Sequence, residues 1–251
     1  MQPAPRTRVK ICCIGSAEEA RLAIRYGASA LGLVSAMPSG PGVIAEELIA
    51  ELAAQIPPGV TSVLLTSRQD AEAISAQQRR CRVNALQICD RLDLDDYARL
   101  REALPGIGLI QVIHVGGTES LDEARVVAPL VDALLLDSGN QTLAVKELGG
   151  TGRVHDWAIS QAIRAAVDVP VYLAGGITPA NAAAAVRAVG PFALDVCTGV
   201  HTEGRLDEAK LAGLFAALDG AVAKAGRRSF TTEHAEDAEN TARQRKKEFG
   251  A

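Results

Sequence analysis

The chain has 251 residues, enough to bury one large core, and this length fits either one α/β barrel or two small domains. Hydrophobic residues make up 48% of it and charged residues 22%, as in an ordinary globular protein, while aromatic residues are only 3%. The net charge of -4 argues against a nucleic-acid partner. The sequence contains no run of 18 apolar residues, so we expect no membrane span.

Cysteine usage and the first residues indicate a reducing compartment. The five cysteines, Cys12, Cys13, Cys81, Cys89 and Cys197, are odd in number and form no CxxC pair, and the His residues are scattered. We therefore expect neither a disulfide framework nor a structural zinc site. The opening residues lack the apolar stretch of a secretory signal, so we expect a cytoplasmic protein.

Short apolar segments alternate along the chain with longer segments of helical spacing. Eight of the short segments have the composition of buried strands: 9–14, 30–35, 61–66, 85–89, 109–115, 133–137, 171–174 and 193–197. The first helical segment follows Ser16, a typical N-cap residue, has Glu19 three residues later and closes on Gly27. Eight such units predict one (β/α)8 TIM barrel over residues 1–226. A doubly wound open sheet is the alternative, but no GxGxxG turn follows the first strand.

The last segment, residues 227–251, differs from the rest of the chain. Its only large apolar residues are Phe230 and Phe249, and its basic and acidic side chains nearly cancel. This composition predicts a polar tail that is disordered or a frayed helix.

The first strand carries a lysine and a thiol on one face. Because side chains alternate along a strand, Lys10 and Cys12 share the face that points into the barrel, while Val9, Ile11 and Cys13 face the helices. Cys12 then lies at the carboxyl end of the strand, where TIM barrels place their chemistry. A neighbouring lysine would favour its thiolate form.

A carboxylate ends the sixth strand. Asp137 closes an apolar run and points inward, which is costly for a carboxylate unless it is solvated or paired at the barrel mouth. On the fourth strand, Gln87 and Cys89 also point inward. A thiol and a carboxylate at opposed strand ends can act as an acid–base pair, with Cys12 and Asp137 as the candidates.

Glycines follow the last two strands. Gly175 and Gly176 come after the seventh strand and Gly199 after the eighth, each just before a predicted helix start. Glycines at these places let a phosphate approach backbone N–H groups, so we expect a phosphate site there.

The motifs VKICCIG, NALQICD, LLLDSGN, GGTGRVHDW, LAGGITPANA and FALDVCTGV together resemble those of the phosphoribosylanthranilate isomerase family, over about residues 8–220. The resemblance implies a tryptophan-biosynthesis barrel that works without a cofactor, as a monomer or homodimer. Its reaction is the Amadori rearrangement of N-(5′-phosphoribosyl)anthranilate, a small phosphorylated sugar amine, to the ring-opened 1-deoxyribulose 5-phosphate.

The resemblance also implies roles for single residues. Cys12 matches the general base that takes the sugar C2′ proton, Asp137 matches the general acid that protonates the furanose oxygen, and Lys10 becomes the electrostatic neighbour of the thiol. The implied phosphate site consists of Gly175, Gly176, Thr198 and Gly199.

The chain departs from the family pattern on the anthranilate side. The loop after the second strand, SAMPSGPGVIAEE, has no Arg or Lys where the family carries an arginine for the anthranilate carboxylate. Arg68, after the third strand, is a possible substitute, although a solvated loop arginine is the simpler interpretation. Cys89 stands where the family usually has His, and Arg153 where Lys is common.

Three alternatives stay open beside the isomerase. The protein could be a paralogue that acts on another phosphorylated sugar amine, or a non-catalytic protein that binds a phosphorylated ligand. Metal-dependent catalysis is disfavoured because His114 and Asp195 belong to no ligand triplet of recognisable spacing, so no metal site is expected.

Overall fold

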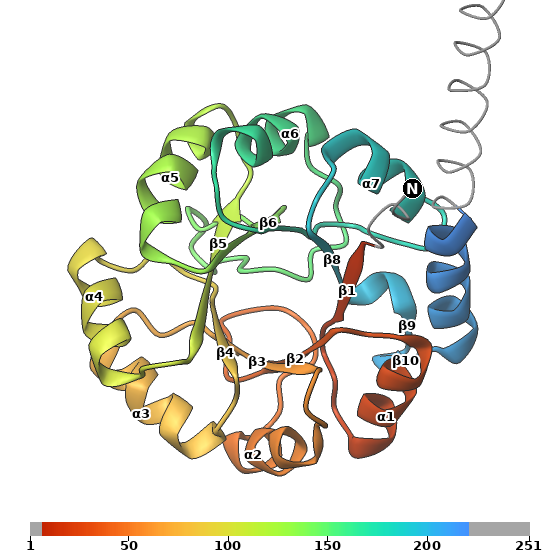
Figure 1. Cartoon of the computed structure of the whole chain (residues 1–251), viewed down its shortest axis with the longest axis horizontal. Coiled ribbons are helices and arrows are strands. Elements are labelled where there is room, and N and C mark those ends of the chain that lie inside the picture. Colours follow the sequence, from red (N-terminus) through yellow and green to blue (C-terminus); the bar gives the residue numbers. More distant parts are fainter. Residues whose placement is uncertain (1–6, 221–251) are drawn as a thin grey trace, which may run out of the picture.

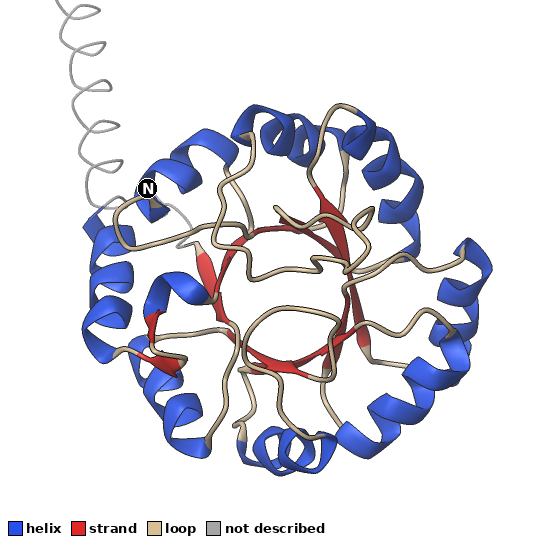
Figure 2. Cartoon of the chain, turned by 180° about the vertical axis from the view of Figure 1, so that it is seen from behind, coloured by secondary structure: helices blue, strands red, loops and turns tan. Residues whose placement is uncertain are grey.

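The computed structural model describes residues 7–220, so the predicted tail at 227–251 and the predicted boundary at residue 226 lie outside the described residues. Eight parallel strands form a closed barrel in chain order, each hydrogen-bonded to the next and the eighth to the first. Helices surround this ring of strands on the outside (Figures 1 and 2). The predicted (β/α)8 TIM barrel is confirmed, and the open sheet is excluded by the pairing of the first strand with the last.

The elements follow the predicted alternation of strand and helix. The barrel strands are β1 (Arg8–Ile11), β2 (Ala30–Val34), β3 (Thr61–Thr66), β4 (Ala85–Ile88), β5 (Gly108–His114), β6 (Ala133–Asp137), β7 (Val171–Leu173) and β8 (Ala193–Val196). The helices between them are α1 (Ala17–Tyr26), α2 (Glu46–Gln55), α3 (Ala71–Cys81), α4 (Leu94–Ala103), α5 (Glu119–Val127), α6 (Trp157–Ala166) and α7 (Ala182–Val189). After β8 come a short hairpin, β9 (His201–Thr202) and β10 (Arg205–Leu206), and a helix that begins at residue 208 and is described to residue 220.

Local sequence signals explain where α1 begins and ends. The Ser16 side chain accepts a hydrogen bond from the backbone N–H of Glu19, and the Glu19 carboxylate accepts one from Gly15 N at 2.8 Å. Both contacts satisfy N–H groups that a helix start otherwise leaves without partners. Gly27 ends the helix in the left-handed region with a φ of 105°, which favours glycine. The predicted caps at Ser16 and Gly27 are confirmed.

The buried side chains form two separate layers. The larger layer lies between the barrel and the helices and consists mainly of Leu, Ile, Val and Ala. The second layer fills the barrel interior, with Val63, Ile110, Val112 and Leu135 among its buried members. These residues come from alternate positions of their strands, as period-two alternation requires. The polar side chains of the interior are therefore exceptions, and several of them gather towards one end.

The barrel closes between β1 and β8. Lys10 lies opposite Asp195 in the register of these two strands, and Cys12 N donates a hydrogen bond to Val196 O at 2.9 Å just beyond them. Figure 1 shows β1 between β8 and β2, although β8 is far away in the sequence. The two ends of the described chain thus jointly position Cys12. No helix within residues 7–220 has both the length and the apolar character to cross a membrane.

Candidate active site

A pocket opens at the carboxyl ends of the strands, where the sequence places the chemistry. It holds about 650 Å³ of empty space, its open mouth included. The end of most strands contributes to its wall, together with parts of the loops after β2, β6 and β7. Cys12 and Asp137 both line this pocket, so the structure brings the predicted thiol and carboxylate together.

Cys12 lies above a buried ion pair. Lys10 Nζ donates to Asp195 Oδ1 at 2.9 Å, and the Lys10 side chain is completely buried. Gly32 on β2 leaves room for both groups, because a β-carbon there would lie 2.7 Å from Cys12 Sγ and 3.0 Å from Lys10 Nζ. Alternation along the strand predicts the lysine beside the thiol, and the structure adds Asp195 as the partner of that lysine.

The electrostatics of this cluster favour a charged lysine and a neutral thiol. Burial raises the pKa of Cys12 to about 11, and the Lys10 ammonium opposes this shift without cancelling it. Burial disfavours the Lys10 ammonium, but the attraction of the Asp195 carboxylate outweighs that effect and raises the pKa of Lys10. Cys12 is therefore mainly a thiol at neutral pH in the unliganded protein.

Asp137 ends β6 as a buried carboxyl group. Its Oδ1 accepts a hydrogen bond from Ser138 N at 2.7 Å, and the Ser138 hydroxyl contacts Thr151 Oγ1 at 2.7 Å. Burial raises the pKa of Asp137, while the Ser138 N–H opposes this shift. A carboxyl group with a raised pKa retains its proton at higher pH, which suits a general acid.

Gln87 on β4 and Cys89, directly after this strand, bring polar atoms to the same pocket. His114 Nε2 contacts Cys89 O at 2.9 Å and does not line the pocket itself. Gln87 is buried and lines the pocket, and its Oε1 has no hydrogen-bond partner. Of the pocket-lining residues within 7–220, only Gln87 has such a buried, unpaired side-chain oxygen or nitrogen. Alternation along the fourth strand predicts that Gln87 points into the barrel, but it predicts no function for this residue.

The predicted phosphate residues fall into two groups. Gly175, Gly176 and Thr198 line the pocket, and both glycines have left-handed backbones, with φ values of 78° and 61°. Gly199 does not line the pocket, since it packs against Ile177 O on the neighbouring loop. The glycines after β7 thus stand at the pocket wall, with backbone conformations that other residues rarely adopt.

Arg68 is placed away from the pocket lining. Its guanidinium lies 3.5 Å from the Glu46 carboxylate, which also pairs with Arg80 at 2.6 Å. The structure therefore does not bring Arg68 to the candidate site, and the suggested carboxylate contact stays a prediction.

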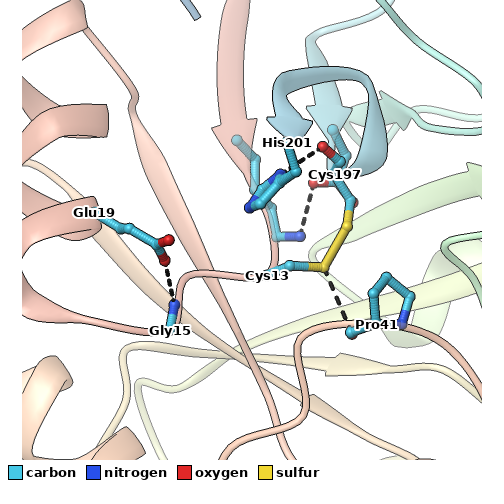
Figure 3. Close-up of a disulfide and its surroundings, with 8 residues drawn as sticks. Cys13, Gly15, Glu19, Pro41, Cys197 and His201 are labelled. Carbon is cyan, nitrogen blue, oxygen red and sulfur yellow. Dashed lines mark hydrogen bonds and ion pairs between the residues drawn. A yellow bond between two sulfur atoms is a disulfide. The ribbon is translucent and has the colours of Figure 1, made fainter. Parts of the chain in front are cut away.

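The structure overturns one expectation about the cysteines. Cys13 and Cys197 form a disulfide with a Cα–Cα distance of 5.9 Å, although 184 residues separate them in the sequence (Figure 3). The closed barrel places the ends of β1 and β8 side by side, which no spacing rule detects. β1 also ends at Ile11, and Cys13 has a left-handed backbone with a φ of 63°. Cys13 therefore lines the pocket instead of facing the helices.

Other groups surround this disulfide at the pocket rim. His201 Nδ1 donates to Cys197 O at 2.8 Å, and Pro41 O lies 3.7 Å from Cys13 Sγ (Figure 3). The disulfide thus connects Cys13, which directly follows Cys12, with Cys197, which directly precedes Thr198. Free thiols within residues 7–220 remain at Cys12, Cys81 and Cys89.

We expect loss of this disulfide to destabilise the barrel, because a cross-link over a long loop restricts the unfolded chain. Cys13→Ala with Cys197→Ala should lower the free energy of unfolding by about 2–4 kcal/mol and the Tm by roughly 5–15 °C. Differential scanning calorimetry with and without dithiothreitol measures the effect. The double variant should not respond to the reductant, and a wild-type Tm that ignores reduction would contradict the prediction.

A glycine variant separates the cross-link from the backbone strain. Cys13→Gly also removes the disulfide, but it relieves the left-handed conformation of a residue with a β-carbon. Its free energy of unfolding should therefore exceed that of Cys13→Ala by about 1 kcal/mol, and its Tm should be higher.

Within the described residues 7–220, no group of three or more His, Cys, Asp or Glu side chains is arranged to hold a metal ion.

Comparisons with known proteins agree on one family. A family described as N-(5′-phosphoribosyl)anthranilate (PRA) isomerase matches residues 9–217. A protein with that name from Methanocella arvoryzae is 34% identical over 82% of this chain and 94% of its own length. Its counterpart from Halobacterium salinarum is 38% identical over 84% of this chain and 94% of its own length.

Solved structures give the same result for the fold. The phosphoribosyl anthranilate isomerase of Thermus thermophilus has a TM-score of 0.71 and 28% identity, covering 85% of this chain and 99% of its own. The enzyme of Thermotoga maritima reaches a TM-score of 0.72 at 26% identity, with the same coverage.

Proposed function

The chain belongs to the N-(5′-phosphoribosyl)anthranilate isomerase family, as its motifs predict, and we propose that Cys12 and Asp137 are the general base and general acid of the isomerase reaction. The family and the close relatives support isomerase activity over a non-catalytic phosphate-binding role. One observation supports the residue assignment most: a buried thiol and a carboxyl group with a raised pKa line the same pocket.

In the first step, Asp137 donates its proton to the furanose oxygen of the substrate. The bond between this oxygen and C1′ breaks, and the nitrogen lone pair forms a C1′=N bond, which gives an open-chain iminium ion and the Asp137 carboxylate. Ser138 N, which donates to Asp137 Oδ1, holds the carboxyl group and stabilises the carboxylate that results.

In the second step, the Cys12 thiolate removes the proton from C2′. The electrons of the C2′–H bond form a C1′=C2′ double bond, and the electrons of the C1′=N bond return to nitrogen. The resulting enolamine gains a proton at C1′ and loses one from its C2′ hydroxyl, which gives the aminoketose. No atom is gained or lost overall, and no cofactor is required.

Lys10 supports the base in this scheme. Of the charged neighbours that affect the Cys12 pKa, Lys10 lowers it and Asp195 raises it more weakly. We therefore expect the double variant Lys10→Met with Asp195→Leu to have a Cys12 pKa above the wild-type value of about 11, without leaving an unpaired buried charge.

Alkylation kinetics test this role directly. The rate at which iodoacetamide modifies Cys12, followed peptide by peptide with mass spectrometry, should titrate near pH 11 in the wild type and at higher pH in the variant. Because the thiolate is then rarer at every lower pH, kcat/KM at pH 8 should fall, on the order of tenfold. An unchanged pH dependence of Cys12 alkylation would contradict the role of Lys10.

Isomerase activity is tested with freshly prepared N-(5′-phosphoribosyl)anthranilate, whose fluorescence changes when the ring opens. Turnover by the purified wild type, together with growth of a tryptophan auxotroph that lacks this isomerase, is the expected result. Binding of ribose 5-phosphate without turnover would instead favour the paralogue or the non-catalytic protein. A cytoplasmic location, and the choice between monomer and homodimer, remain proposals that fractionation and light scattering can test.

A further inference from the structure

The pocket wall has two chemically different halves. The half formed by the loops after β7 and β8 offers the backbone of Gly175 and Gly176 and the hydroxyl of Thr198, which suits the phosphate. The other half, formed by β2, β3 and the loops after β2 and β6, is mostly apolar. Its apolar side chains are Val34, Met37, Pro41, Leu65 and Leu148.

The apolar half carries no positive charge. None of the residues that line the pocket within the described part of the chain is Lys or Arg. The ionisable side chains of the lining are thiols and the carboxyls Asp137 and Asp195. An anion that entered this half would therefore meet apolar side chains and no compensating positive charge, which raises its free energy.

The cations nearest to this half in the chain are already paired. Lys146 Nζ contacts Asp90 Oδ2 at 2.5 Å, and Arg153 pairs with Glu147. Arg68 pairs with Glu46. The Ser39 hydroxyl, which does line the pocket, donates to Lys146 O at 2.7 Å. The usual cationic and hydroxyl donors for a carboxylate are thus engaged elsewhere.

Beside this half the pocket offers an unpaired acceptor. Gln87, on β4, lines the pocket, and its buried Oε1 has no hydrogen-bond partner. An unpaired buried acceptor fits an N–H group and repels a carboxylate. A phosphoribosyl arylamine carries an N–H group that persists in the iminium ion and in the enolamine, so Gln87 can serve the whole reaction.

From these observations we propose that the pocket recognises phosphoribosyl arylamines as a class, through the phosphate, the amine N–H and the aromatic ring, and does not read the carboxylate of anthranilate. The proposal rests on the isomerase activity and names its substrate range. N-(5-phosphoribosyl)aniline, which lacks the carboxylate, is then a second substrate. Its product is 1-anilino-1-deoxyribulose 5-phosphate.

The chemistry does not require the carboxylate. The bonds that change are C1′–O, C1′–N, C2′–H and the hydroxyl bond at C2′, and the aniline nitrogen supplies the same lone pair as the anthranilate nitrogen. The anthranilate carboxylate would face the open mouth of the pocket, where water solvates it. Discrimination between the two substrates should therefore be small.

The test compares the two substrates on the same enzyme. Each is prepared fresh from [2-¹³C]ribose 5-phosphate and the arylamine, and NMR follows the labelled carbon from the carbinol to the ketone region. The proposal expects kcat/KM values within about tenfold of one another, whereas a charge-assisted contact to the carboxylate would separate them by about ten- to a hundred-fold or more.

Three variants sharpen the comparison. Met37→Arg places a guanidinium on the apolar wall and should raise the preference for the carboxylated substrate at least about tenfold. Lys146→Met should leave the preference unchanged, because Lys146 pairs with Asp90 and does not line the pocket. Gln87→Leu should lower kcat/KM for both substrates by a similar factor.

The possible failures are distinguishable. Turnover of the anthranilate substrate with a kcat/KM for the aniline substrate more than about tenfold lower would overturn the proposal and leave the isomerase activity intact. A preference lost in Lys146→Met would overturn it as well, by assigning the carboxylate to that lysine. No turnover of either substrate would instead contradict the isomerase activity itself.

Discussion

Replacing Cys12 with Ala is expected to lower kcat by about 10²–10⁴, the usual contribution of a positioned general base. The Cys12 thiol lines the pocket, whereas none of the residues of β1 itself, Arg8–Ile11, does. Without the thiolate, C2′ must lose its proton to water, while ring opening at Asp137 continues. Steady-state fluorescence with fresh phosphoribosylanthranilate measures the loss.

Deuterium at C2′ of the substrate identifies the step that is lost. In Cys12→Ala the removal of this proton becomes rate-limiting, so the isotope effect on kcat should increase over the wild type. Cys89→Ala is the matched control, since Cys89 is a second buried thiol of the same pocket. A large loss of kcat in Cys89→Ala together with a small loss in Cys12→Ala would identify Cys89 as the general base instead.

Replacing Asp137 with Asn is expected to lower kcat by a comparable factor, about 10²–10⁴. The amide keeps the size of the carboxyl group but has no proton of suitable acidity for the furanose oxygen. Ring opening then becomes rate-limiting, so the C2′ deuterium isotope effect should fall towards unity. The two variants thus affect the same isotope effect in opposite directions, which a general loss of folding would not do.

Asp90→Asn is the control for this substitution. Asp90 is also a buried carboxylate near a strand end, but it binds Lys146 and does not line the pocket. Its replacement should lower the free energy of unfolding and leave kcat nearly unchanged. If Asp90→Asn and Asp137→Asn reduced kcat equally, the role of Asp137 as the acid would be refuted.

Local patterns were sufficient for much of the candidate site. Alternation along β1 placed Lys10 and Cys12 on the inner face, and an apolar run that ended in a carboxylate marked Asp137. The alternation of side chains has a period of two residues and lies within one strand, so the residues next to a position are enough to predict its face. The strand count needed only the repeated change between short apolar and helical segments.

Local sequence patterns carry no signal for contacts between distant strands. Lys10 meets Asp195 across 185 residues, and their pairing depends on the register between β1 and β8. Alternation continued past Ile11 predicts Cys13 on the helix side, and this prediction is wrong because the strand ends at Ile11. The left-handed backbone of Cys13 then turns it towards Cys197.

The pairing of β1 with β8 has a consequence for biosynthesis. β1, the first strand of the barrel, finds its second neighbour only after the last barrel strand has been made, so its free edge stays open while the strands between them are translated. A chain cut off before β8 would keep this edge, and would also lack both Asp195 and the partner of Cys13. Premature termination should therefore yield a fragment that associates with other chains instead of a smaller working enzyme.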